Sequence, residues 1–135
     1  MNEIPYGKEL VIKEENSEEF RKESVERLEK SLEGEDVPAI VSFDNPEKIR
    51  ELLTEKRLEL MKTIMTEEPE SITELAEQTN RDIKDVHTDL ELLEKKKIVF
   101  FKKEGRKKKP VIPYDDIKVD YSLKNTLMDS KGLEA

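Results

Sequence analysis

Three segments with helix-spaced apolar residues follow one another between residues 54 and 97, and the joints between them are short. This order constrains the fold more than any other feature of the chain. The first segment starts at Thr54, and the sequence Glu67-Glu68-Pro69 ends it. The second opens with Ser71-Ile72-Thr73-Glu74, a capping box in which hydroxyl and carboxylate can each satisfy a free backbone N–H group. The pattern predicts three helices, of which the middle one is short.

The joint between the second and third segments is tight. Asn80 is one of the few residues other than glycine that tolerate a left-handed backbone. Asp82 then provides a cap for a longer helix that ends at the lysines of residues 95–97. The apolar positions that we expect to face a core are Leu58, Met61, Ile64, Met65, Ile72, Leu75, Ala76, Ile83, Val86, Leu90 and Leu93.

A hairpin is predicted after the third helix. Residues 98–101 are β-formers, Glu104-Gly105 is a plausible turn, and Pro110 marks the returning strand as an edge. With that turn, the facing pairs would be Lys103 with Arg106 and Lys102 with Lys107.

Helix, short helix, tight turn, longer helix and hairpin make up a winged helix-turn-helix arrangement. The segments "LTEKRLELMKTIM" and "SITELAEQTNRDIKDVHTDLELLEKKKIV", followed by "VIPYDDIKVDYSL", resemble predicted archaeal and bacterial regulators of the MarR-like winged-helix kind. The resemblance covers roughly residues 42 to 123 and implies DNA binding. It also implies a second possibility, because some such relatives are thought to act as antitoxins. Asn80 departs from the pattern, since such turns commonly have glycine.

The N-terminal residues predict two short strands, 8–13 and 38–44, around one helix that is capped by Ser17 and stopped by Gly34. About 40 residues are too few to be stable alone, so this piece should pack on the remainder or on a second copy. Four apolar residues form a narrow stripe on the helix: Phe20, Val25, Leu28 and Leu32.

The expected fold class is therefore α+β and mainly helical. Residues 1–45 would form an acidic strand-helix-strand extension for dimer or partner contacts. Residues 46–123 would form the winged helix-turn-helix DNA-binding domain, with residues 116–123 as a further strand. Residues 124–135 would be a flexible tail.

Charge is distributed unevenly. The chain has a net charge of -8, and residues 1–45 carry 13 acidic and 6 basic side chains. Residues 98–112 instead carry six basic side chains and one acidic one. A polyanion would be attracted to this run through counterion release, whereas lysines that protect an edge strand from pairing would explain it without a ligand. The candidate DNA-binding residues are Ser71, Thr73, Arg81, Lys84, Asp85, His87, Thr88, Lys102, Lys103, Arg106, Lys107 and Lys108.

Several function classes find no support in the sequence. Cysteine is absent, and His87 is the only histidine, so no metal site, cofactor or catalytic nucleophile is evident and we expect no enzyme. DNA contact and a packing role both remain open for His87. The longest apolar run, residues 39–41, is far too short to span a membrane, and no signal peptide is evident, so we expect a cytoplasmic protein.

Two functional hypotheses follow. The first is a transcription regulator that binds double-stranded DNA as a homodimer, with helix 82–97 in the major groove and the hairpin 98–112 on phosphates. The second is an antitoxin, whose acidic N-terminal residues would neutralise a toxin protein and which would also regulate its own promoter.

Overall fold

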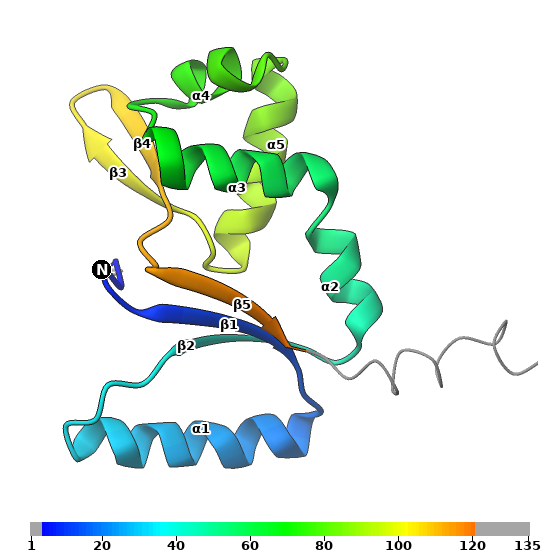
Figure 1. Ribbon diagram of the computed structural model, residues 1–135, viewed down its shortest axis with the longest axis vertical. Coiled ribbons are helices and arrows are strands. Elements are labelled where there is room, and N and C mark those ends of the chain that lie inside the picture. The colour runs from blue at the N-terminus through cyan, green and yellow to red at the C-terminus, as the bar shows by residue number, and fades with distance from the viewer. Residues whose placement is uncertain (1–3, 121–135) are drawn as a thin grey trace, which may run out of the picture. The chain divides into compact units, whose positions relative to one another are not determined.

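The computed structural model describes residues 4–120, which fold into the five helices and five strands of Figure 1. The α+β class is therefore confirmed. The chain forms two compact units. We call residues 52–113 the helical unit, and residues 5–51 together with 114–120 the sheet unit. The predicted tail at 124–135 lies outside the described residues, as does the end of the predicted strand at 121–123.

The sheet unit contains a three-stranded parallel sheet in the order β2-β1-β5. In the register of this sheet, Leu10 of the central strand lies opposite Ala39 on one side and Ile117 on the other. Leu10 and Ile12, which alternate with half-buried residues along β1, are fully buried. The elements of the unit are β1 (Glu9–Glu14), α1 (Ser17–Leu32), β2 (Ala39–Phe43), α2 (Pro46–Leu52, which ends at the first residue of the helical unit) and β5 (Asp116–Asp120).

Strand β5 belongs to a different unit from the one that the sequence suggested. We expected residues 46–123 to form one domain, but β5 pairs with β1, more than 100 residues away, and so belongs to the sheet unit. Alternating apolar residues identify a strand without naming its partner. The physical reason for the pairing is that Ile117 and Val119 extend the apolar face that Leu10 and Ile12 begin.

Helix α1 is capped by Asn16 and not by Ser17, which corrects the expected start. The Asn16 side chain accepts a hydrogen bond of 2.8 Å from the backbone N–H of Glu19. The Glu19 carboxylate accepts one of 3.4 Å from the backbone N–H of Asn16, which completes a capping box. Asn16 has extended backbone angles, so Ser17 is already the first helical residue. Gly34 follows the helix at a φ of 86°, in its predicted place.

The helical unit contains three helices and an antiparallel hairpin (Figure 1). The elements are α3 (Glu55–Glu67), α4 (Ile72–Thr79), α5 (Ile83–Lys95), β3 (Phe100–Glu104) and β4 (Lys107–Val111). The buried side chains of these helices and of the segment after α5 are Leu60, Met61, Ile64, Leu75, Ala76, Val86, Leu90, Leu93, Ile98 and Val99.

Three predicted core positions of the helical unit are exposed. The exposed fractions of Leu58, Met65 and Ile83 are 46%, 39% and 46%. In α3, the helix turns Leu60, Met61 and Ile64 inward, so the buried stripe is displaced from the predicted one by part of a turn. Several overlapping stripes fit the sequence of α3, and only the tertiary packing selects one of them.

Candidate nucleic-acid interface

Helix α4 is capped by Ser71, as predicted. The backbone of Ser71 is extended, and its hydroxyl accepts a hydrogen bond of 3.1 Å from the backbone N–H of Glu74. The Glu74 carboxylate accepts from Glu70 at 3.2 Å, one residue earlier than in a standard capping box. Ser71 is half-buried, whereas Thr73 in the first turn of α4 is exposed.

The turn from α4 to α5 uses the two residues that the sequence singled out. Asn80 adopts the left-handed conformation, with φ 54° and ψ 47°. The next backbone N–H, that of Arg81, donates to the carbonyl of Ala76 at 3.0 Å and so closes the end of α4. The Asp82 carboxylate then accepts from the backbone N–H of Lys84 at 2.8 Å and starts α5. These local signals were therefore sufficient to predict the turn.

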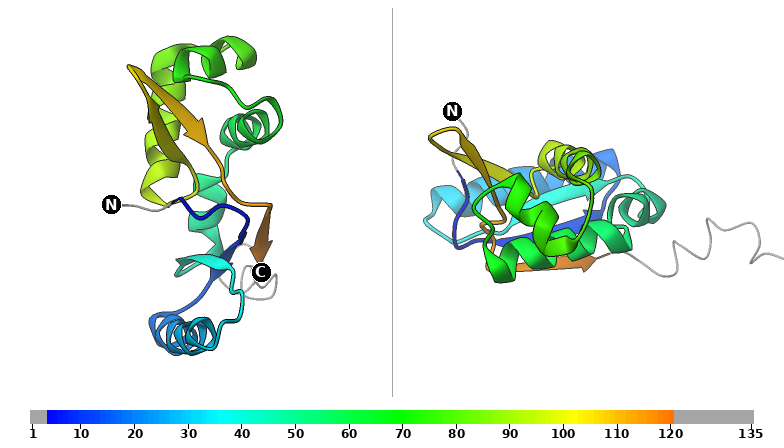
Figure 2. Two further views of the ribbon diagram at one scale, coloured as in Figure 1. Left: turned by 90° about the vertical axis from the view of Figure 1, so that its left-hand side faces the viewer. Right: turned by 90° about the horizontal axis from the view of Figure 1, so that it is seen from above.

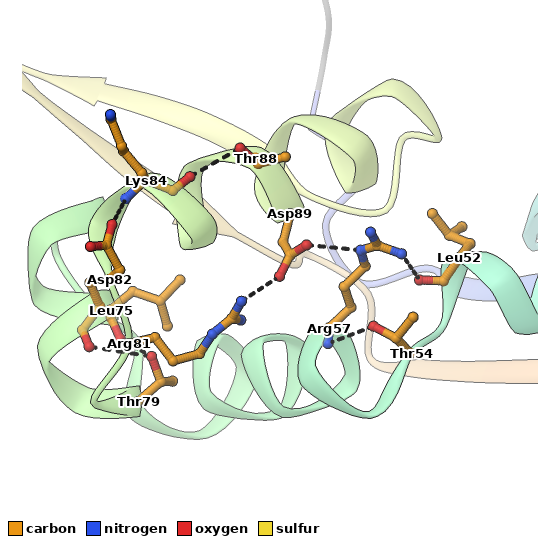
Figure 3. A network of polar contacts seen from close by, with 11 residues as sticks. Leu52, Thr54, Arg57, Leu75, Thr79, Arg81, Asp82, Lys84, Thr88 and Asp89 are labelled. Carbon is orange, nitrogen blue, oxygen red and sulfur yellow. Dashed lines mark hydrogen bonds and ion pairs between the residues drawn. The ribbon is translucent and has the colours of Figure 1, made fainter.

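Arg81, one of the candidate DNA-binding residues, points into the fold and not toward solvent. Its guanidinium donates to one carboxylate oxygen of Asp89 at 2.8 Å, and Arg57 donates to the other oxygen at 3.1 Å (Figure 3). The three side chains keep only 14–17% of their surface exposed. Arg57 also donates to the carbonyl of Leu52 at 3.1 Å. This network connects the start of α3, the turn and the middle of α5.

Sequence reasoning missed Arg57 and Asp89. A signal was present, because both lie on the inward face of their helix. Arg57 lies three residues before the buried Leu60, and Asp89 lies three residues after the buried Val86. A charged side chain on an inward helix face requires a partner, because an unpaired charge is costly to bury. A positive charge on one inward face and a negative charge on another therefore indicate an ion pair.

The outward side of α5 presents a mixed set of polar groups. Lys84, Asp85, His87 and Thr88 are all exposed, and Lys84 has no ion-pair partner in the described part of the chain. The imidazole Nδ1 of His87 lies 2.8 Å from a carboxylate oxygen of Glu91. The Thr88 hydroxyl donates to the carbonyl of Lys84 at 3.0 Å, one turn earlier, which leaves its oxygen able to accept.

The hairpin register differs from the predicted one. Glu104 lies opposite Lys107, so Gly105 and Arg106 form the two-residue loop. Gly105 has a φ of 65°, and glycine at the first loop position suits a type II′ turn. The partner of each lysine on β3 therefore moves two residues along β4: Lys103 faces Lys108 and Lys102 faces Lys109. One physical reason is that this register places Glu104 opposite a positive charge.

Positive charge is concentrated at the hairpin tip. Lys102, Lys103, Arg106, Lys107 and Lys108 are all exposed. Lys102 lies 4.0 Å from Glu104, and the Lys108 ammonium lies 5.8 Å from the centre of the Phe101 ring. We refer to the exposed residues Lys102, Lys103, Arg106, Lys107 and Lys108 as the basic tip.

The base of the hairpin is fixed to the helices. Pro110 is buried, and the Lys109 ammonium lies 3.5 Å from the carboxylate of Glu70, just before α4. Strand β4 contacts both α3 and α4. Figure 2 shows the tip extending beyond these helices. The basic tip and the outward side of α5 are thus presented by one compact unit.

The model of a protein family described as HVO_A0114 matches residues 52–119, slightly more than half of the chain. The chain belongs to the HVO_A0114 family. No curated protein matches it. The HVO_A0114 segment includes the whole α4–turn–α5 segment, the basic tip and nearly all of β5. The candidate interface of this chain therefore lies entirely within the part that the family shares.

Among residues 4–120, no cluster of three or more acidic or histidine side chains is arranged to hold a metal ion. Within the same residues, no helix has the length and apolar character needed to cross a membrane.

Proposed function

We propose that this chain is a DNA-binding transcription regulator with a MarR-like winged helix-turn-helix in its helical unit. The observation that carries the proposal is the exposed basic tip, held on the same compact unit as the α4–turn–α5 segment. In the winged helix-turn-helix, the second helix of the motif reads the major groove and the hairpin reaches neighbouring phosphates. The absence of an enzymatic activity and a cytoplasmic location remain predictions.

Helix α5 is the proposed reading element. Its N-terminal end carries Lys84 with no ion-pair partner in the described residues, and the next outward turn carries His87 and Thr88. The Lys84 ammonium can donate to phosphates or base edges, and the Thr88 hydroxyl oxygen can accept from a base amino group. Asp85 would repel phosphates, but a carboxylate can accept from the amino group of cytosine. Arg81 supports the helix from behind through Asp89 and is not proposed to contact DNA.

The basic tip is the proposed phosphate clamp. Two like-charged pairs face each other across the hairpin, each at a cost of roughly 0.2–1 kcal/mol. A polyanion would turn this repulsion into attraction, because each neutralised phosphate releases condensed counterions. Protection of an edge strand by lysines is the competing explanation. It does not require Arg106, which lies in the loop and not on a strand.

A selection from a pool of random DNA duplexes tests the proposed function, because the operator is unknown. The full chain at about 150 mM salt should enrich a common motif, and a two-fold symmetric motif would agree with a homodimer. Recovery of the unselected pool, with no enriched motif after repeated rounds, would rule out sequence-specific binding.

The second candidate function is that of an antitoxin. The observation that favours it is the acidity of residues 1–45, with 13 acidic and 6 basic side chains, which suits a basic protein partner better than DNA. Co-expression with the product of the adjacent gene tests it. A stable complex that suppresses the toxicity of that product would support the antitoxin, and growth arrest despite co-expression would exclude this pair.

A further inference from the structure

Helix α1 presents its apolar residues to solvent. In this 16-residue helix no residue is buried, and the exposed fractions of Val25, Leu28 and Leu32 are 53%, 61% and 79%. The half-buried residues of α1 are polar: Glu23, Ser24 and Arg27. The Glu23 carboxylate accepts from the Lys13 ammonium of β1 at 3.0 Å, which identifies the side of α1 that faces the sheet. Figure 1 shows α1 running along one side of the sheet.

The exposed apolar residues have the spacing of a coiled-coil seam. Arg21, Val25, Leu28 and Leu32 recur at intervals of four, three and four residues. This is the alternation of the a and d positions of a heptad, with Val25 and Leu32 at a and Leu28 at d. The seam lies roughly 150° around the helix from the side that carries Glu23 and Arg27, so the sheet leaves it accessible.

The charges of α1 indicate which partner would cover the seam. Residues 17–32 carry five acidic and four basic side chains, although the segment 1–45 as a whole is strongly acidic. A basic partner would gain little from a nearly neutral helix, whereas a second copy would meet little repulsion. The positions that flank a seam on one side are the e positions of the heptad, and here they are Lys22 and Glu29. Both are exposed.

We propose that α1 pairs with α1 of a second copy in an antiparallel, two-fold symmetric coiled coil. Antiparallel pairing places a positions opposite d positions, so Val25 of each copy meets Leu28 of the other. The same register brings Lys22 of each copy next to Glu29 of the other, twice in a symmetric pair. Arg21 then covers Leu32 with its aliphatic stem and directs its guanidinium toward the exposed acidic residues after the helix.

The seam is short, so the dimer is weak. Three partly exposed aliphatic residues per copy bury only a few hundred Å² in total, against roughly 1,000 Å² for a stable interface. We therefore expect a dissociation constant on the order of 1–100 μM. The contact would supply the dimer on which the proposed two-fold operator readout depends. Its test uses no DNA, so its failure and that of the proposed DNA binding can be told apart.

Sedimentation of the full chain from about 1 to 500 μM tests the proposal, a range that brackets the expected constant. Leu28→Glu should give a monomer over this range. Lys22→Glu and Glu29→Lys should each raise the dissociation constant about 3- to 10-fold, because two ion pairs are lost and two repulsive contacts are formed. The double variant, Lys22→Glu with Glu29→Lys, should restore dimerisation to within about 2-fold of the natural chain, since it re-forms both pairs with reversed sign.

Lys30→Glu is the matched control, because Lys30 lies at the outer f position of the heptad and should leave the dimer unchanged. Circular dichroism checks that each variant keeps its helices. If Leu28→Glu unfolds the chain, the charge-swap series decides the question alone. A natural chain that stays monomeric at 500 μM, a dimer that survives Leu28→Glu, or a double variant no better than the single ones would overturn the proposal.

Discussion

Glu15 is the one buried charged side chain of the described residues, and it lies just after β1. Its side chain is 1% exposed, and the Ser42 hydroxyl donates to one carboxylate oxygen at 2.5 Å. Burial raises the pKa of Glu15, and the neighbouring Glu23 carboxyl raises it further. The same contact, together with the Lys13 ammonium, lowers the pKa of Glu23. Glu15 is therefore the member of the pair that more readily holds a proton.

The stability of the sheet unit should depend on pH through Glu15. Because the folded pKa lies above the ordinary value of 4.5, this group stabilises the fold fully below about pH 4.5 and less as pH rises through the raised pKa. Glu15→Gln removes the ionisation and keeps a donor for Glu23. In urea unfolding, the variant should gain about 1 kcal/mol relative to the natural chain between pH 4.5 and 8. Glu26→Gln, on the exposed side of α1, should show no such trend. A difference for Glu15→Gln that stays constant with pH would contradict this account.

Asp89 holds two guanidinium groups, so its loss leaves two partly buried positive charges without their partner. We expect Asp89→Asn to lower the unfolding free energy by about 2–4 kcal/mol, measured by urea denaturation. Glu94→Gln, an exposed change on the same helix, should alter it by less than about 0.5 kcal/mol. Equal effects of the two changes would show that the network does not stabilise the fold.

At the scale of elements, local chemistry proved predictable and cross-strand pairing did not. Ser71, Asn80 and Asp82 act on backbone groups within a few residues, so the α4–turn–α5 segment could be predicted from sequence. The hairpin register depends on many weak facing pairs, among them Glu104 with Lys107, and neighbouring registers differ by little energy. The cap of α1 was missed because Asn16 and Ser17 are both good caps and adjacent.

Helix α5 provides the prediction for the proposed reading element. Lys84→Ala should weaken binding to a selected operator by about 5- to 30-fold, the loss of roughly 1–2 kcal/mol for one charged contact, and should leave the thermal midpoint within about 2 °C. Lys95→Ala, at the opposite end of the same helix, is the control for charge. Unchanged affinity and sequence preference in a fluorescence anisotropy titration of Lys84→Ala would remove this residue from the proposed interface.

The whole molecule separates its charges along the chain. The net charge of the chain is -8, and residues 1–45 are acidic. The hairpin is basic, and five of its six basic side chains are exposed. An acidic chain is repelled by DNA as a whole, so any binding has to be local and sensitive to salt. The sequence predicted this polarity correctly, because charge is read directly from composition. It did not predict that β5 returns to β1, because parallel pairing between distant segments leaves no local signal.

The salt dependence of DNA affinity tests most directly whether the basic tip binds DNA phosphates. For the double variant Arg106→Ala with Lys108→Ala, the slope of log K against log salt should flatten by up to about 2, and all DNA sequences should be weakened about equally. The thermal stability should hold or rise slightly, because the Lys103–Lys108 repulsion is removed.

The control is Lys56→Ala with Lys62→Ala, which makes the same change in net charge at exposed positions of α3 in the same unit. Titrations of both double variants and the natural chain should be run at four or more salt concentrations, beside an aggregation assay. If the basic tip binds phosphates, the slope should be flatter for the tip variant alone. An unchanged slope with increased aggregation of the tip variant would contradict phosphate binding and would assign the lysines to edge protection.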